Sequence, residues 1–72
     1  MTINWRKKEQ ASSSVVLRIR NALGRQRISL RQAFNLVTRT SEITIGTLYT
    51  KDECLAIAEA LLLSGYEVSL DL

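Results

Sequence analysis

The pattern of apolar and polar residues predicts a helix over residues 15–23. Apolar side chains recur there at the i, i+4, i+7 and i+8 positions that share one helix face, with one more beside them: Val15, Ile19, Ala22, Leu23 and Val16. Three serines precede this segment, and the last of them, Ser14, is in place to cap the helix. Gly24 supplies a stop signal at the other end.

A second helix is predicted from residue 30 to about residue 38. Ser29 is followed three residues later by Gln32, which is the spacing of a capping box. The apolar stripe expected to face the core consists of Leu30, Ala33, Phe34 and Val37. The polar segment RTSE then ends the helix.

A third helix has the clearest boundaries. Thr50 and Glu53 form a second capping box, and Gly65 suits the left-handed residue just past the end. Its predicted core stripe, widened by two further leucines, consists of Cys54, Ile57, Ala58, Leu61, Leu55 and Leu62.

Strand signals lie between and after the helices. Residues 43–49 (ITIGTLY) are β-branched and aromatic, with Gly46 as a candidate bulge. After residue 65, apolar and polar residues alternate, which predicts a strand with one buried face: Tyr66, Val68, Leu70 and Leu72. Residues 2–5 (TINW) also suit a short strand, followed by a loop to residue 14.

The order of these elements predicts an α+β two-layer sandwich, (β)-α-α-β-α-β. Three helices then cover one face of a small sheet of two or three strands. The domain is expected over residues 15–72, preceded by an N-terminal segment, residues 1–14. At 72 residues, the core should supply a net stability of only about 3–5 kcal/mol, and the chain has no room for a deep active-site cleft.

Charge is divided unevenly along the chain. Residues 1–40 hold nine basic residues and one acidic residue, whereas residues 41–72 hold one basic and six acidic residues. Such polarity attracts an acidic partner to the basic half, and it also allows salt bridges between the halves. The sequence lacks a long apolar segment and a secretory signal pattern, so we expect a cytoplasmic protein with no membrane partner.

Candidate catalytic chemistry is sparse. The chain contains no histidine, and its single cysteine, Cys54, lies on a predicted core face. Asp52 and Glu53 stand at a helix start, where carboxylates cap the helix and interact with its dipole. We therefore expect neither an enzyme nor a bound metal or cofactor.

Arginines are the main functional signal. Five of them fall within 14 residues, around the turn that joins the first two helices: Arg18, Arg20, Arg25, Arg27 and Arg31. Arginine pairs in a bidentate manner with carboxylate or phosphate. Three interpretations stay open, namely a solvated face, a surface that binds an acidic protein, and a surface that binds nucleic acid.

Three segments resemble the C-terminal domain of the bacterial large-subunit ribosomal stalk protein: VVLRIRNALG, ISLRQAFNLV and TKDECLAIAEALLLSGYEVSL. They occur in the family's order and span residues 15–72. The same fold occurs in an adaptor that feeds substrates to a bacterial protease. In the stalk family the first two helices form a basic, partly apolar surface that recruits translation GTPases. The resemblance therefore implies a non-catalytic module of this fold, acting as a regulator or adaptor of a translation, transcription or proteolysis complex.

Two positions carry that implication to named residues. If Gly24 matches the family's glycine, Arg20 falls on a family arginine, and Arg31 matches a basic residue at the start of the second helix. The chain departs from the family where a lysine of the second helix is replaced by Phe34, and where the glycine-rich turn becomes GRQRIS. The dimerisation domain and hinge of the stalk protein are absent from these 72 residues.

Overall fold

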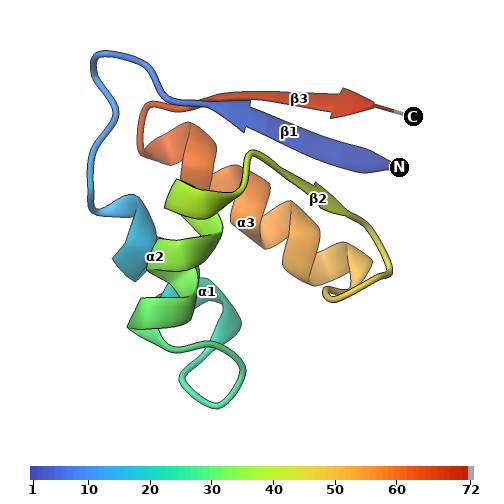
Figure 1. Cartoon of the computed structure of the whole chain (residues 1–72). Coiled ribbons are helices and arrows are strands. Elements are labelled where there is room, and N and C mark those ends of the chain that lie inside the picture. The colour runs from blue at the N-terminus through green and yellow to red at the C-terminus, as the bar shows by residue number, and fades with distance from the viewer. Residues whose placement is uncertain (72) are drawn as a thin grey trace.

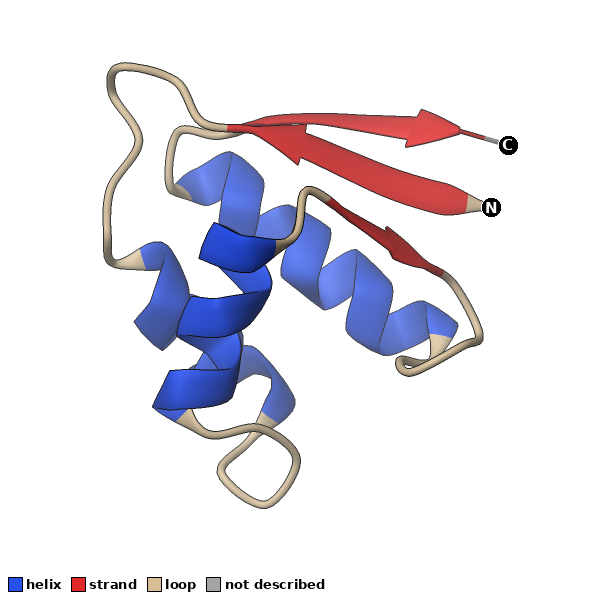
Figure 2. Cartoon of the chain, in the orientation of Figure 1, coloured by secondary structure: helices blue, strands red, loops and turns tan. Residues whose placement is uncertain are grey.

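The computed structural model describes residues 1–71 and has the predicted α+β fold (Figure 1). The elements are β1 (Thr2–Arg6), α1 (Val15–Leu23), α2 (Leu30–Arg39), β2 (Glu42–Thr44), α3 (Lys51–Leu63) and β3 (Glu67–Asp71). Three helices pack against a three-stranded antiparallel sheet, so the strands form one layer and the helices the other (Figure 2).

The candidate strand near the N-terminus occupies the centre of the sheet. The strand order is β2-β1-β3, and both neighbours run antiparallel to β1. Ile3 and Trp5 on β1 are buried, while Thr2, Asn4 and Arg6 alternate with them. The sheet therefore depends on the N-terminal segment, which supplies the strand that joins its two edges.

The core lies between the sheet and the helices. Its largest fully buried side chains come from β1, α1 and α3: Ile3, Val15, Ile19, Cys54, Ile57 and Leu61. Helix α2 adds the fully buried Ala33. The prediction that Cys54 is a core residue is confirmed, and burial raises the pKa of its thiol. Burial of this kind makes the thiol a poor nucleophile.

Local signals set the helix ends as predicted at four places. Both capping boxes form, with the Ser29 and Thr50 side chains accepting from the backbone N–H groups of Gln32 and Glu53. Gly24 ends α1 with a φ of 97°. After α3, Gly65 adopts a φ of 87°, and the Tyr66 N–H donates to the Leu61 carbonyl at 3.0 Å. This hydrogen bond and the left-handed Gly65 form the glycine-terminated helix end expected there.

The prediction that Ser14 caps α1 is wrong. Ser14 already has a helical backbone (φ −62°, ψ −12°), and its side chain makes no capping bond. The side chain that caps the backbone here is Ser12, two residues earlier, whose Oγ accepts a hydrogen bond from the Ser14 N–H at 3.2 Å. With three adjacent serines, composition alone does not distinguish which one adopts the non-helical backbone that a cap requires.

The prediction of a strand over residues 43–49 is also wrong beyond Thr44, where β2 ends. The chain turns at Gly46, whose φ is 89° and whose N–H donates to the Tyr49 carbonyl at 2.9 Å. Gly46 is therefore a turn residue and not a bulge. Ile45 and Tyr49 on either side of the turn still pack against the core, so the turn carries the apolar composition of a strand.

The alternation expected in β3 holds only near its start. Tyr66 and Val68 are half-buried and pack against the core, whereas Leu70 at the far end of β3 is 54% exposed. Leu72, the last residue of the predicted apolar face, lies outside the described residues.

Candidate functional site

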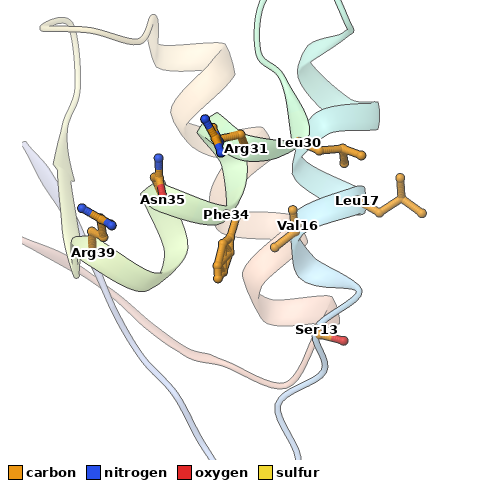
Figure 3. Close-up of a pocket in the computed structure, with 8 residues that line it drawn as sticks. All are labelled: Ser13, Val16, Leu17, Leu30, Arg31, Phe34, Asn35 and Arg39. Carbon is orange, nitrogen blue, oxygen red and sulfur yellow. The ribbon is translucent and has the colours of Figure 1, made fainter.

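A largely apolar groove runs along the contact between α1 and α2. It has a volume of about 870 Å³, and four of its lining side chains are apolar and are called its floor below: Val16, Leu17, Leu30 and Phe34. In Figure 3, Val16 and Phe34 point into the space between the two helices. Leu17, Leu30 and Phe34 are each nearly half exposed. Large apolar side chains that gather on a surface in this way mark an interaction site more often than scattered ones do.

The groove arises because the face of α2 that packs against the core is not the face predicted from the sequence. Leu30 and Phe34 were expected in the core, and that expectation is wrong. The buried face of α2 consists of Ala33, Leu36 and Val37. The two candidate stripes overlap at positions 33 and 37, and helical periodicity alone does not choose between them.

Polar and basic side chains line the groove on the α2 side. Arg31, Asn35 and Arg39 follow one side of α2 in Figure 3, and Ser13 completes the lining at the start of α1. Arg31 and Arg39 are eight residues apart, which corresponds to about 12 Å along the helix. Neither arginine forms an ion pair with any of residues 1–71. Their charges are therefore free to meet an acidic ligand.

Arg20 lies at the end of the same side of α1. It follows Val16 by four residues and Leu17 by three, so the three side chains share one helix face. Arg20 is half-buried, and its Nε has no hydrogen-bond partner within the described chain. Of the five arginines predicted from the sequence, only Arg31 lines the groove, and Arg20 lines a separate hollow with Asn21, Gly24 and Arg25.

Arg27 has a different role, because it is bonded within the fold. Its Nε and Nη2 pair with the Glu53 carboxylate at 2.5 and 3.1 Å, and Nη2 also donates to the Leu48 carbonyl at 2.6 Å. The guanidinium lies 5.1 Å from the centre of the Tyr49 ring. Arg27 therefore ties the turn between α1 and α2 to the start of α3.

Arg18 and Arg25 are exposed but do not line the groove. Arg18 is two residues from Arg20, or about 200° around the helix, so it faces another side of α1. Arg25 lies in the turn after Gly24, beside Arg20 and Asn21. The structure thus does not bring the five predicted arginines together on one surface.

Sequence reasoning missed Leu17 and Arg39 as groove residues. Leu17 offered a signal, since it is apolar yet lies outside the predicted core stripe of the first helix. Arg39 offered none, because its position depends on how far α2 extends and on the rotation of that helix.

The ion pair between Arg27 and Glu53 predicts a pH dependence of stability. Hydrogen bonds from Arg27 and from the Thr50 backbone hold the pKa of Glu53 below its ordinary value. A carboxyl with a lowered folded-state pKa stabilises the fold above its unfolded pKa of about 4.3. This stabilisation is lost as the pH falls through the folded-state pKa. Glu53→Gln should therefore unfold more easily than the original protein at pH 7, and the difference should shrink below about pH 4.

Urea unfolding at a series of pH values measures this effect. Glutamine can keep the capping interaction with Thr50, so the change isolates the charge. Glu67→Gln provides a second variant, since Lys8 and Arg6 lower the pKa of Glu67 in the same way. A difference between Glu53→Gln and the original protein that stays constant from pH 7 to pH 3 would contradict the assignment.

Other chemistry is limited in the part of the chain that the structure describes. Among residues 1–71, no group of three histidine, cysteine, aspartate or glutamate side chains is placed to hold a metal ion. None of the helices there is long and apolar enough to cross a membrane. The groove between α1 and α2 is therefore the site that we consider for function.

Comparison with known proteins adds no relative. No protein-family model, curated protein or solved structure matches this chain. The resemblance to the ribosomal stalk domain stays a prediction.

Proposed function

We propose that this protein is a small, non-catalytic binding module whose groove between α1 and α2 docks an acidic amphipathic helix of a partner protein. The observation that supports the proposal most strongly is the pairing of an apolar floor with unpaired arginines. Leu17, Leu30 and Phe34 offer apolar area, and Arg31 and Arg39 offer positive charge along one side.

A helix is the partner element that this shape fits best. Amphipathic helices dock by laying an apolar face into a groove, with anchors spaced three and four residues apart. Carboxylates two helical turns apart on such a helix would be about 10–12 Å apart and could reach both Arg31 and Arg39. Apolar anchors between them would cover Phe34 and Leu30.

The resemblance to the stalk domain supports a role in a larger complex. The three segments that carry it fall on α1, on α2 and on α3 with β3, and the first two of these helices form the groove. We propose that the protein acts as an adaptor or regulator of a translation, transcription or proteolysis complex, with a translation GTPase as one candidate partner.

A synthetic helical peptide tests the proposal directly. The probe has about 18 residues, above the length at which isolated helices become marginal, with leucines at every third or fourth position and glutamates two turns apart. Replacing Arg31 and Arg39 together by glutamate should weaken binding about tenfold or more, because two attractions become repulsions. Fluorescence anisotropy of the labelled peptide measures the affinity.

The matched control replaces Arg18 and Arg25 by glutamate. Both double variants change the net charge equally, so long-range attraction falls alike and only the groove contacts differ. Equal loss of peptide binding in the two variants would contradict a groove site.

Electrostatic binding of nucleic acid is the alternative, supported by Arg18 and Arg25, which form no ion pair with residues 1–71. It predicts that both double variants weaken binding to duplex DNA alike, with affinity that falls steeply as salt rises. A control peptide that keeps the glutamates and replaces the leucines by alanine separates the two functions. Docking in the groove predicts that this control binds much more weakly than the probe, and equal binding would favour the electrostatic alternative.

A further inference from the structure

The exposed face of α3 has the chemistry that the groove is proposed to bind. Leu55 and Leu62 lie seven residues apart on this face and are 45% and 58% exposed, so the prediction that they widen the core stripe of α3 is wrong. Asp52 and Glu59 lie on the same side of the helix, three residues before Leu55 and three before Leu62. All four side chains lie on the side of α3 away from the buried Cys54, Ile57 and Leu61. The face is therefore an acidic amphipathic stripe without a partner in the described chain.

The spacing of charges on the two surfaces is similar. Asp52 and Glu59 are seven residues apart, about 10 Å along α3, and Arg31 and Arg39 are about 12 Å apart along α2. Neither acid forms an ion pair within residues 1–71. Each surface thus offers two unpaired charges, of opposite sign and similar separation, beside exposed leucine side chains.

We infer that the groove of one copy docks the exposed α3 face of a second copy. This inference rests on the proposed function, because it assumes that the groove binds acidic amphipathic helices. The two surfaces differ, so the contact joins copies head to tail and leaves one free groove and one free α3 face at the ends of each chain of copies. A partner protein would then compete with α3 for the groove.

Charge favours this contact over pairing of two α3 faces. In a symmetric α3–α3 contact, the acids Asp52 and Glu59 would face the same acids, which is unfavourable. In the head-to-tail contact they meet Arg31 and Arg39. Lys51 begins the α3 face, one turn before Leu55, and is the one basic residue of that helix.

Within one copy, α3 does not reach the groove with this face. α3 packs against α1, β1 and β3 through its buried side, and the leucines and acids lie on the opposite side. The groove lies between α1 and α2. A second copy is therefore needed to bring the two surfaces together.

Sedimentation equilibrium of the original protein gives the first test. The average mass should rise with protein concentration at low salt and fall towards the monomer mass as salt screens the charges. A protein that stays monomeric at low salt up to about 1 mM, the range of weak specific affinities, would overturn the inference.

Two complementary variants give the decisive test. The groove variant carries Arg31→Glu and Arg39→Glu and keeps its α3 face. The α3 variant carries Leu55→Ala and Glu59→Ala, keeps its groove, and leaves Asp52 in the first turn to interact with the helix dipole. Removing the charge, and not reversing it, prevents this face from pairing with the glutamates of the groove variant. Each variant alone should be monomeric where the original protein associates, and an equal mixture should give a one-to-one dimer and nothing larger.

The mixture distinguishes this contact from any other mode of association. Circular dichroism first establishes that both variants are folded. Association of either variant alone to the same extent as the original protein, or a mixture that stays monomeric, would overturn the head-to-tail contact.

The probe peptide separates failure of this inference from failure of the proposed function. If the proteins stay monomeric but the peptide binds the original protein and not the groove variant, the groove function holds and only the second copy is excluded as its ligand. If the peptide also fails to bind, the proposed function fails too.

Discussion

Replacing Gly65 by alanine should destabilise the protein by about 3 kcal/mol. Gly65 has a φ of 87°, and a left-handed backbone costs a non-glycine residue about 1–2 kcal/mol. A Cβ there would also lie 2.8 Å from the carbonyl oxygen of Gln10 and 3.2 Å from the Ala11 Cα. These are backbone atoms, so the chain itself must shift, which accounts for the rest of the expected loss. Since a domain of this size has only about 3–5 kcal/mol of net stability, the variant should be largely unfolded under mild denaturing conditions.

Gly46 provides the matched control. Its φ of 89° is nearly the same, but a Cβ at this position meets nothing within 4 Å. Gly46→Ala should therefore show only the conformational cost of about 1–2 kcal/mol. Urea unfolding of both variants measures the difference, and equal losses at the two glycines would contradict the close approach of residues 10 and 11 to the end of α3.

The conformation of Gly65 can be predicted from the sequence, but its contact with Gln10 cannot. Its left-handed conformation follows from local signals, because the helix before it ends there and the strand after it alternates. Its contact with Gln10 is long-range, and it depends on the loop that crosses the end of α3, where the Ser12 N–H donates to the Ser64 carbonyl at 2.8 Å. No feature of the sequence near residue 65 points to that crossing.

Removing the apolar floor of the groove should weaken binding of the probe peptide about 50-fold. The double variant is Leu30→Ala with Phe34→Ala. Each side chain is nearly half exposed in the free protein. Burying that exposed half on docking would contribute about 1–1.5 kcal/mol of binding free energy per residue. Slightly more than half of each side chain is buried in the free protein, so the variant should also lose about 2–3 kcal/mol of stability. Circular dichroism therefore first establishes that the variant is folded at the temperature of the binding measurement.

The control removes apolar area elsewhere. Leu48 and Leu70 are 77% and 54% exposed and do not line the groove. Replacing both by alanine should leave peptide affinity within about twofold, a difference of less than 0.5 kcal/mol. If the floor variant binds as tightly as this control, the apolar floor has no part in recognition.

Much of the fold could be predicted because its signals are local. Capping boxes at Ser29 and Thr50, and the glycines after two helices, set the helix ends from residues close in sequence. The order of elements then predicts the two layers of the sandwich. The central position of β1 was not predictable in the same way, since strand order depends on pairing between residues far apart, such as Ile3 with Ile43 and Leu70.

The candidate site could be predicted less well. The sequence correctly marks the first two helices as basic, but charge along the chain does not tell which arginines are already paired. Arg27 is bonded to Glu53, 26 residues away, and only the folded chain shows this. The apolar chemistry of Phe34 predicts a core residue, but Ala33, Leu36 and Val37 form the face of α2 that packs against the core, and this leaves Phe34 exposed.

Chemical-shift mapping of the isotope-labelled protein with the probe peptide tests groove docking most directly. The account predicts saturable shifts of backbone amides in α1 around Val16 and Leu17 and in α2 from Leu30 to Arg39, with the amides of β3 unchanged. Saturable shifts confined to the outer face of the sheet or to the turn around Arg25, or no saturable shifts at all, would contradict it.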